Sequence, residues 1–479
     1  MSYTAKPLEL PRANEKEHEE DPREHLMHDP RPRGEMNEMV MESMHSTTWK
    51  YWTATGILAV IVVTCLFYAW YYLIMQGLGV AGVNRPVYWG IFLVEVVFWI
   101  GISHAGTFIS AILRVMKVEG RRPFTRAAEL MTTFGLVQAG ISVFLHMGRV
   151  WLSYWLIPIP NERGLWPDFH SPLMWDFMAI STYLLCSTMY LFLPLIPDMA
   201  MARDRSTGWR KVVYRILALG FRGTEGEWKN LTTAMNTFAF AIIPVMFSVH
   251  TIVAWDFAMA TRPGWSSSVF GPYFVIGALH SGMAAVAIVL FLIRSTMKNM
   301  KYFLRPEHFD LLGMLMLMVS MAWAYFYFND YIVPWYGGDK WEKILFDFVQ
   351  HGPEWYLWYT MLFCNIVVPW AILWNKKWRR TPWLLASAGL LINVGMWLER
   401  FIIIPETLTI NRMPFTWRLY VPGVEIALTI GNFAFFFLLY MLASRVIPLI
   451  PVWEVQEGQE SHTLRKIGKA NIPTLSDME

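Results

Sequence analysis

The segment 100–113, IGISHAGTFISAIL, places His104 inside an otherwise apolar run. A related segment, 276–289, reads IGALHSGMAAVAIV and places His280 at the matching position. Both follow the pattern Ile-Gly-x-x-His, then a small residue and a glycine. Internal repeats of this kind are typical of membrane proteins that are built from duplicated helical units. We therefore expect two copies of one unit.

The composition indicates a membrane protein. Hydrophobic residues make up 55% of the 479 residues and charged residues 16%, whereas soluble domains carry about 25% charged residues. Runs such as YWTATGILAVIVVTCLFYAWYYLIM, which begins at Tyr51, exceed the roughly 20 residues that a helix needs to cross a bilayer. The 25 tryptophans and 20 tyrosines fit this class because their rings favour the membrane interface. We predict an all-α integral membrane protein. Its expected partners include membrane lipids and no nucleic acid.

The hydropathy pattern predicts about ten transmembrane helices. Their ranges are 51–75, 88–116, 124–157, 171–196, 229–258, 268–297, 308–335, 353–376, 382–404 and 420–446. Spans two to five and six to nine would form two parallel-repeat four-helix bundles, related by a pseudo-two-fold axis along the membrane normal, with spans one and ten flanking them.

The same pattern gives a domain organisation. We expect a polar tail over 1–49 that is disordered or bound to a partner, because it lacks an apolar core. The first span and its loop occupy 50–87, the first bundle with the functional site 88–258 and the second bundle 268–404. The last span occupies 405–446 and a second tail 447–479.

Loops rich in basic residues alternate along the chain with loops that carry few. The loop after span two contains Arg114, Lys117, Arg121, Arg122 and Arg126, and the loop after span four contains seven basic residues within 203–229. The segments RSTMKNMKYFLR and NKKWRR are similarly basic, whereas the intervening loops carry few such residues. Because basic loops stay on the cytoplasmic side, we expect both termini in the cytoplasm.

Polar residues converge on the outer third of the first bundle. His146 and Arg149 lie in the outer half of span three, three residues apart on one expected helical face. Asp176 lies near the outer start of span four, and His250 and Asp256 near the outer end of span five. Ionisable groups inside a membrane are candidates for function.

Each of these residues also has a structural explanation. Asp176 could favour the positive end of its helix, and Arg149 could extend to the interface. His250 and Asp256 are six residues apart, so only one of them is expected to face a shared site. His104 and His280 could be packing residues that bond to a neighbouring backbone carbonyl, with nearby glycines allowing close helix contact.

A second polar set is a candidate proton path or a collection of structural pairs. Its members are Glu95, Glu129, Asp330, Glu354, Glu399 and Arg400. Glu399 and Arg400 are sequence neighbours, so we expect that they cannot share a helical face.

Histidine and carboxylate near the outer surface suit quinol chemistry. A quinol headgroup presents two hydroxyls that need hydrogen-bond partners, and its oxidation releases two protons. Histidine and a carboxyl group in a low dielectric are matched to accept protons near pH 7. The three cysteines, Cys65, Cys186 and Cys364, have no spacing suited to an iron–sulfur cluster, so this chain is expected to bind no metal.

These features resemble the NrfD/PsrC-like quinone-interacting membrane subunits. The resemblance rests on the ten-span plan with duplicated units, the motif ISHAGTFISAIL, the outer His146 and Asp176 and the polar amino-terminal tail, and it covers about residues 50–450. Within that family, the length and the span-two motif are most similar to the ActC type of subunit of bacterial alternative complex III, and the paralogous ActF type is similar but shorter.

The resemblance implies a quinol:electron-acceptor oxidoreductase complex in a bacterial inner membrane, with menaquinone or ubiquinone as the quinone. It implies His146 and Asp176 as the catalytic, quinol-contacting pair. Beyond the resemblance, the depth of Arg149, His250 and Asp256 extends the quinol-binding site to them, and His104 is a further binding candidate as an ionisable group at mid-membrane. Electrons would pass to an extracytoplasmic iron–sulfur subunit and on to multihaem and monohaem cytochrome c subunits. A paralogous NrfD-like membrane subunit is a further implied partner, and proton translocation an implied coupling.

Two other functions compete with this interpretation. A dihaem b-type cytochrome would use facing histidines on different helices as axial ligands, for which His146 and His250 are candidates. A secondary transporter would also contain internal repeats and polar groups within the membrane. A reduced b-type absorption band would identify the first, and isolation as a lone, redox-silent chain would favour the second.

The alternation of basic loops generates a topology prediction. Single cysteines placed in the 158–170 and 257–268 loops should react with an impermeant thiol reagent in intact cells, because these loops face outward. A cysteine in the 206–220 loop should react only after the membrane is opened. Labelling of 206–220 in intact cells, with none at 158–170, would reverse the orientation.

Overall fold

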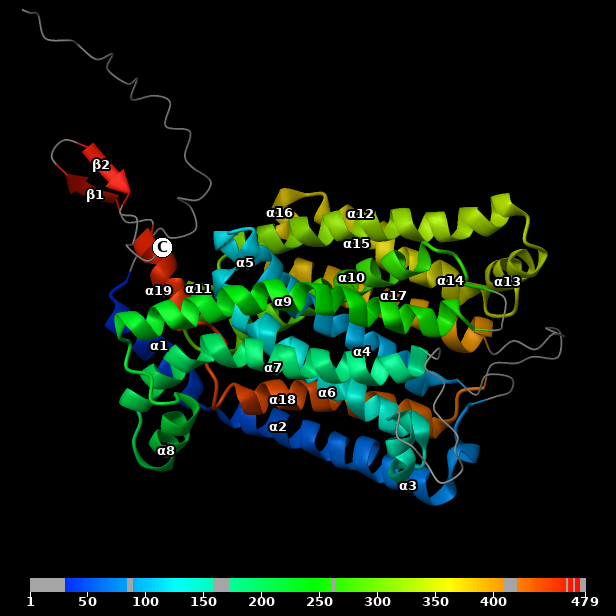
Figure 1. Ribbon diagram of the computed structural model, residues 1–479, viewed down its shortest axis with the longest axis horizontal. Helices are drawn as coiled ribbons and strands as arrows, with labels where there is room; N and C mark the ends of the chain where they lie inside the picture. The colour runs from blue at the N-terminus through cyan, green and yellow to red at the C-terminus, as the bar shows by residue number, and fades with distance from the viewer. Residues whose placement is uncertain are drawn as a thin grey trace, which may run out of the picture.

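The computed structural model describes residues 31–83, 89–157, 172–260, 264–408, 420–461, 464–467 and 470–473. Within this part, ten apolar helical segments are long enough to cross a membrane, which confirms the predicted all-helical membrane fold. The segments are Trp49–Gln76, Ile91–Val115, Glu119–Met147, Met174–Asp204, Glu225–Ala258, Phe270–Thr296, Pro306–Gly337, Trp355–Leu373, Pro382–Leu408 and Gly423–Ala443. They lie alongside one another along the long axis of the molecule (Figure 1).

The helices of these segments are labelled in Figure 1. The first three segments contain α2 (Trp49–Ile61) with α3 (Ala69–Gln76), α4 (Ile91–Thr107) with α5 (Leu113–Val115), and α6 (Thr125–Met147). The next four are α7 (Pro172–Asp204), α9 (Glu225–Ala258), α10 (Phe270–Thr296) and α12 (Pro306–Gly337). The last three contain α14 (Trp355–Leu362) with α15 (Val368–Leu373), α17 (Pro382–Phe401) and α18 (Gly423–Ala443).

Shorter elements lie at the ends of the bundle. They are α1 (Arg33–His45), α8 (Gly208–Leu217), α11 (Met300–Phe303), α13 (Lys340–His351), α16 (Lys376–Arg379) and α19 (Val452–Ser461). Strands β1 (Leu464–Ile467) and β2 (Ala470–Pro473) form an antiparallel pair. Since α1 and α19 contact each other, we call their end of the bundle the terminal end and the opposite end the distal end.

Two helix ends differ from the prediction by the largest margins. The third span was expected to reach residue 157, but α6 ends at Met147 because Gly148 has a φ of +65°, which a right-handed helix cannot continue. The fourth was expected to end at 196, but α7 continues to Asp204 through Pro194 and Pro197. Prolines are tolerated in membrane helices because neighbouring groups can satisfy the freed backbone.

Part of the expected disordered tail is a packed helix. In α1, Met36, Val40 and Met44 are buried, and their spacing of four residues places them on one face. This apolar stripe joins the main core at the terminal end. Residues 33–45 are thus a helix packed on this chain's own core, which differs from the disordered or partner-bound tail predicted for 1–49, while residues 1–30 lie outside the described part.

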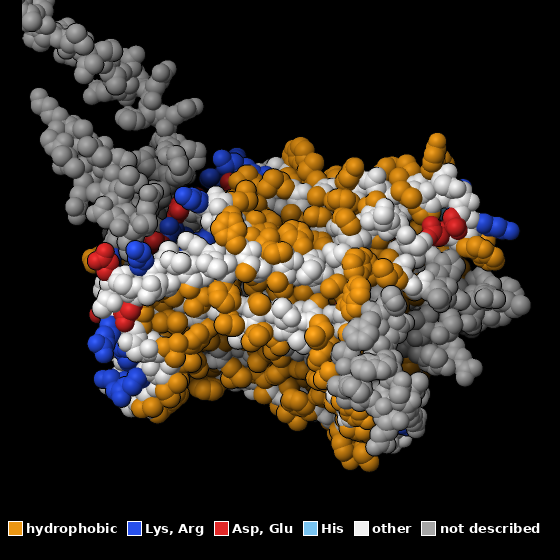
Figure 2. All heavy atoms as spheres, viewed as in Figure 1, with side chains coloured by type: hydrophobic (Ala, Val, Ile, Leu, Met, Phe, Trp, Pro, Cys, Tyr) orange, Lys and Arg blue, Asp and Glu red, His pale blue; other side chains and the backbone are white. Residues whose placement is uncertain are grey.

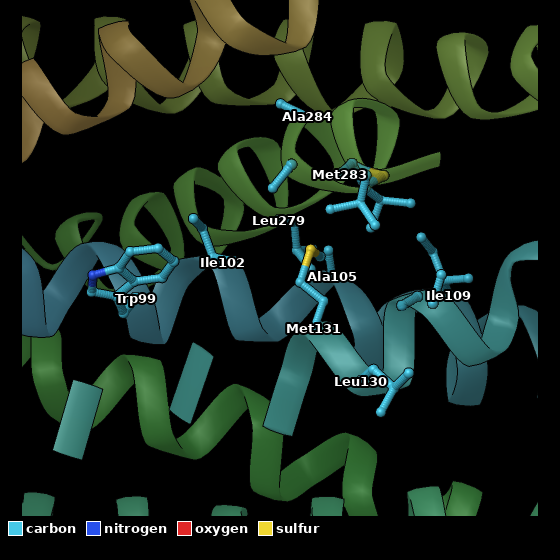
Figure 3. Packing of buried hydrophobic residues seen from close by; sticks show 14 of the residues in the cluster. Trp99, Ile102, Ala105, Ile109, Leu130, Met131, Leu279, Met283 and Ala284 are labelled. Carbon is cyan, nitrogen blue, oxygen red and sulfur yellow. The ribbon is translucent and has the colours of Figure 1, made fainter. Parts of the chain in front are cut away.

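The centre of the fold is the contact between α4 and α10, the two helices that carry the repeated histidine motif (Figure 3). A Cβ atom added to Gly282 would lie 2.5 Å from the Cβ of Ala105 and 2.9 Å from the carbonyl oxygen of Ile102. On the other helix, a Cβ at Gly101 would lie 3.3 Å from the Oγ of Ser281. The motif glycines therefore allow two helix backbones to touch, as small residues do in membrane helix pairs.

The helices around this contact follow a recurring arrangement. α4 packs against α6 and α9, and α10 packs against α12 and α17. These are the pairs expected if spans two to five and six to nine were equivalent units. The pseudo-two-fold relation of the two units stays a prediction, because packing partners alone do not establish a symmetry axis.

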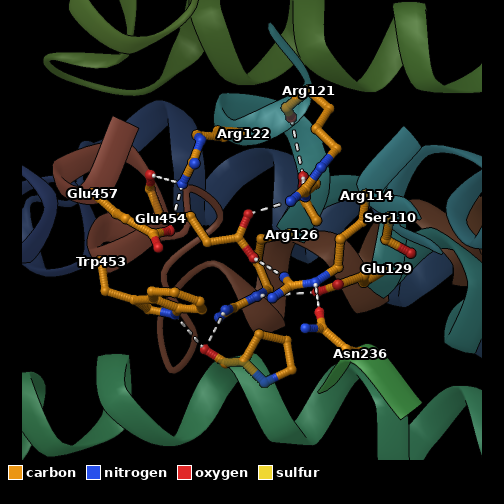
Figure 4. Close-up of polar contacts among 12 residues, drawn as sticks. Ser110, Arg114, Arg121, Arg122, Arg126, Glu129, Asn236, Trp453, Glu454 and Glu457 are labelled. Atoms are coloured by element: carbon orange, nitrogen blue, oxygen red, sulfur yellow. Dashed lines mark hydrogen bonds and ion pairs between the residues drawn. The ribbon is translucent and has the colours of Figure 1, made fainter. Parts of the chain in front are cut away.

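Charged side chains gather at the two ends of the bundle, most of them at the terminal end, whereas apolar side chains cover its length (Figure 2). At the terminal end, arginines from the segment after α4 hold α19 in place (Figure 4). Arg121 donates to the Glu454 carboxylate at 3.1 Å, and Arg122 to Glu457 at 2.5 Å. Burial raises the pKa of Glu454, but the charges of Arg121 and Arg114 and of two further arginines lower it more, so that it lies below its ordinary value.

The α4–α10 contact gives a stability prediction. Replacing Gly282 by Val should lower the free energy of unfolding by about 1–3 kcal/mol, because the new side chain must displace the α4 backbone. The matched control is Gly140→Val in α6, where an added Cβ meets no atom within 4 Å. Thermal unfolding in detergent, followed by size-exclusion chromatography, measures both. Equal melting temperatures for the two variants would contradict close backbone contact at the motif.

Candidate functional site

The distal end of the first unit brings two carboxyl groups together. Asp176 lies in the second turn of α7, and Asp256 lies in the last turn of α9. The two helices pack along each other, and their carboxyl groups are within hydrogen-bonding reach. The preceding residues, Trp175 and Trp255, make an edge-to-face contact with ring centroids 6.0 Å apart. A hydrogen bond between two carboxyl groups requires that one of them carries a proton, because two carboxylates at this separation repel each other.

A second polar layer lies deeper between the same helices. His250 precedes Asp256 by six residues, about 9 Å along the helix, and its ring packs edge-on against His104 with centroids 4.7 Å apart. Tyr183 of α7 also contacts the His104 ring, at 5.3 Å. The ring nitrogens of His104 lie 2.6 Å from the carbonyl oxygen of Ile100 and 2.9 Å from that of Met246 in α9. His104 therefore fastens α9 to α4, as expected of a packing histidine.

An open groove of about 300 Å³ runs between α7 and α9 beside these layers. Its lining residues are Trp175, Met178, Ala179, Thr182, Val245, Ser248 and Ile252. Trp175 and Thr182 are the sequence neighbours of Asp176 and Tyr183, so the groove spans the depth of both polar layers, although its lining residues include neither Asp176 nor Tyr183. Most of its wall is apolar, which suits an occupant that arrives from lipid.

His146 and Arg149 do not share the helical face that the sequence predicts. Because α6 ends at Met147 and Gly148 turns the chain, Arg149 lies outside the helix and is exposed. His146 lies in the last turn of α6, which packs beside α7, and its Nδ1 is buried without a hydrogen-bond partner. His146 is therefore a buried candidate at the same end of the bundle as the carboxyl pair, whereas Arg149 is exposed outside the helix.

His280 has a different environment from its repeat counterpart. Its ring stacks on Trp323 with centroids 5.9 Å apart and faces the backbone of Asn365. The ring is within reach of a backbone hydrogen bond at Asn365, the kind of partner expected of a packing histidine, although neither ring nitrogen meets strict hydrogen-bond geometry.

Glu399 and Arg400 form a direct ion pair, contrary to the expectation that they cannot share a face. The Nη1 of Arg400 donates a hydrogen bond to the Glu399 carboxylate at 2.6 Å, because the long arginine side chain bends back toward the preceding residue. Tyr273 and Trp323 also donate to the Glu399 carboxylate. The guanidinium lies 4.0 Å from the ring centroid of Phe274, which stacks on His250 at 5.2 Å. This network therefore extends from the second unit to the deeper layer of the first.

The other members of the candidate proton path are dispersed. Glu95 accepts hydrogen bonds from Trp99 and Trp397 at 2.9 and 2.8 Å. Glu129 lies at the terminal end beside the buried Arg126, 3.4 Å away. Asp330 is buried with both carboxyl oxygens unpartnered, and Glu354 precedes α14 half-buried. The described contacts do not connect these residues into one path.

Three buried polar residues are absent from the sequence-based site. Tyr183 joins the deeper layer, Glu406 is buried with both carboxyl oxygens unpartnered, and Glu425 accepts a hydrogen bond from the backbone of Gly82 at 3.1 Å. Glu406 and Glu425 stand in or beside predicted spans and could have been selected as intramembrane acids. Tyr183 carries no such signal, because tyrosines are common throughout this chain.

The packing around His250 does not suit the haem alternative. Its ring is completely buried and lies between His104 and Phe274. Both nitrogens of His104 face backbone carbonyls. A haem macrocycle needs open space beside its axial ligands, and the ring of His250, one of the two ligand candidates, has none. Among the described residues, no group of three or more His, Cys, Asp or Glu side chains is arranged to hold a metal ion.

A comparison with known families identifies the architecture. The family model described as polysulphide reductase, NrfD, matches residues 79–411, which include both motif helices and the carboxyl pair. The chain belongs to the NrfD family. This NrfD-family chain is thus an integral membrane protein of about ten helices, as the structure shows independently.

Curated relatives of this NrfD-family chain carry names of membrane subunits. It is 23% identical to the Hdr-like menaquinol oxidoreductase integral membrane subunit of Archaeoglobus fulgidus, over 86% of this chain and 96% of the relative. It is 24% identical to the menaquinone reductase integral membrane subunit of Nitratidesulfovibrio vulgaris, over 80% and 88%. A putative dimethyl sulfoxide reductase membrane subunit of Halobacterium salinarum is 26% identical, but the match spans 49% of this chain and half of that relative.

Proposed function

We propose that this chain is the quinone-binding membrane subunit of a quinol oxidoreductase complex, and that the groove between α7 and α9 receives the quinol. The observation that carries the proposal is the Asp176–Asp256 carboxyl pair, which lies at the depth of Trp175, the groove-lining neighbour of Asp176. The names of the two relatives with the longest matches, menaquinone reductase and menaquinol oxidoreductase subunits, support a quinone of the menaquinone type. The length and motif resemblance supports placing it with alternative complex III.

The groove and the carboxyl pair would bind different parts of the quinol. The apolar wall, with Met178, Ala179 and Val245, suits the isoprenoid chain and the faces of the headgroup. Trp175 lines the groove next to Asp176, where it can stack on the quinol ring. One quinol hydroxyl would donate to the ionised member of the carboxyl pair.

The same residues can accept the protons. Oxidation of a quinol releases two protons and two electrons. The carboxyl pair holds one proton and can take one more, since its second carboxylate is then neutralised. His146, whose Nδ1 is buried and unpartnered, is proposed to take the second. Both groups lie at the distal end, which the basic loops assign to the outside, so the protons would leave outward.

The electrons require a partner, because the three cysteines of this chain have no spacing suited to an iron–sulfur cluster. We propose an extracytoplasmic iron–sulfur subunit that docks at the distal end and passes electrons to cytochrome c subunits. Exposed aromatic side chains support a docking surface there, with Trp151 61% and Tyr154 46% exposed next to α6. The paralogous membrane subunit and proton translocation stay proposals from the resemblance alone.

Removing one carboxylate should leave assembly intact but slow turnover. Asp176→Asn and Asp256→Asn should each reduce quinol oxidation by the assembled complex about 10²–10⁴-fold, the usual contribution of a general acid–base group. His146→Leu should fall in the same range. The double variant at Asp176 and Asp256 should lose less than the product of the single effects, because the two groups act as one unit. Steady-state turnover with a soluble quinol analogue measures this.

The matched control is Asp204→Asn at the other end of α7, where the exposed carboxylate pairs with Arg203. Its turnover should be unchanged, since exposed ion pairs contribute little. In the groove, Ala179→Trp should raise the KM for quinol more than it changes kcat, because it fills the binding space. Normal turnover in assembled Asp176→Asn and Asp256→Asn complexes would move the quinol site elsewhere.

The partner proposal has its own test. A photo-crosslinking amino acid at Trp151 should capture an iron–sulfur protein in membranes that contain the whole complex. The same residue at Trp209, an equally exposed tryptophan at the terminal end, should not. Capture of the iron–sulfur protein only from Trp209 would overturn the assignment of the distal end as the electron exit.

A further inference from the structure

Helix α8 connects the two helices of the candidate site and stands apart from the rest of the bundle. It follows α7 at the terminal end, packs against it, and leads into α9 (Figure 1). Its sequence is GWRKVVYRIL, ten residues with both basic and apolar side chains. The proposed quinol chemistry makes no use of it.

The helix presents two separate apolar faces. One side, with Tyr214 and Ala218, is buried in the main core. The other carries Trp209, Val212 and Ile216, spaced as residues i, i+3 and i+7, with exposed fractions of 68%, 56% and 67%. A helix that only covered the bundle would place polar residues on its second side. This exposed apolar stripe therefore needs a nonpolar surrounding.

Basic residues form a strip between these two faces. Lys211 and Arg215 are exposed and separated by one helical turn, and Arg205 is exposed just before the helix. None of these three makes a direct ion pair within the described part of the chain; Asp204 is paired with Arg203, and Arg205 and Lys211 lie near enough for their charges to act on it. An unpaired basic strip beside an apolar stripe is the pattern of a helix that lies in a membrane interface.

The surroundings of α8 strengthen the positive field. Burial lowers the pKa of His45 at the end of α1, and the charges of Arg210 and Arg445 lower it further, so these arginines lie close to this corner. Trp49 and Trp52 at the start of α2 are 72% and 61% exposed. Tryptophans at such positions mark the level of the lipid headgroups.

We propose that α8 is an interfacial anchor that binds anionic phospholipids in the leaflet at the terminal end. Trp209, Val212 and Ile216 enter the boundary between headgroups and acyl chains, and Lys211 and Arg215 contact the phosphate groups. Charge complementarity selects this occupant, because basic side chains next to a bilayer favour anionic over zwitterionic lipid. Since α8 joins α7 to α9, the anchor also fixes the height of the two helices that carry the carboxyl pair.

Site-directed spin labelling tests the position of the helix. Nitroxides at Val212→Cys and Lys211→Cys, in a full-length chain whose three native cysteines are replaced, are compared in lipid nanodiscs. The label at 212 should be more accessible to oxygen, which partitions into the bilayer, and the label at 211 to a water-soluble nickel complex. Aqueous accessibility at 212 would overturn the proposal. Protection at 212 from both reagents would do so as well, because it would mean that protein covers the stripe.

Lipid selectivity tests the role of the charges. In nanodiscs of mixed phosphatidylglycerol and phosphatidylcholine, Lys211→Glu with Arg215→Glu should reduce the phosphatidylglycerol retained on purification by roughly tenfold. The control, Lys117→Glu with Lys301→Glu, changes the net charge equally at exposed positions of the same end and should retain it. An equal loss in both variants, or no loss in either, would show that α8 does not select anionic lipid. Neither readout depends on quinone binding.

Discussion

The close contact between the α4 and α10 backbones is the constraint on which the rest of the structure depends. Gly101 and Gly282 have no side chains of their own, so the two central helices approach until each glycine touches the backbone or a small side chain of the other helix. In a lipid environment, such dispersion contacts replace the hydrophobic effect as the force between helices. Each of the two helices then packs against two others of its own unit, so the contact sets the spacing of both units.

The polar interior is organised from this contact outward. The Nδ1 of His104 lies 2.6 Å from the Ile100 carbonyl of its own helix, and its Nε2 lies 2.9 Å from the Met246 carbonyl in α9. A neutral imidazole has one N–H and can donate to only one of these two carbonyls. The contact with Met246 joins α9 to α4, and α7 packs on α9 in turn. The Asp176–Asp256 pair lies one layer above this histidine.

Buried acidic residues have different partners at the two ends of the bundle. At the terminal end, buried acids face arginines, as Glu454 faces Arg121 and Arg114. At the distal end, the acids Asp176, Asp256 and Glu406 have no such cation among the described contacts, and Glu399 with Arg400 is the exception. Paired charges suit a docked structural helix such as α19. Carboxyl groups that no cation faces, in a low dielectric, suit proton transfer, which is consistent with a quinol site at that end.

The sequence by itself determined the membrane class and the ten spans, because the length of an apolar run and the position of glycine and proline are local properties. It also gave the depth of each polar residue, since a helix rises a fixed distance per residue. Rotation about the helix axis and the choice of neighbour depend on packing, which no local pattern contains. Only the tertiary structure therefore decided that Asp176 meets Asp256, that Arg400 folds back onto Glu399, and that His280 stacks where His104 bonds. The positive φ of Gly148, which separates Arg149 from His146, likewise arose from the folded chain, since a glycine permits that turn without requiring it.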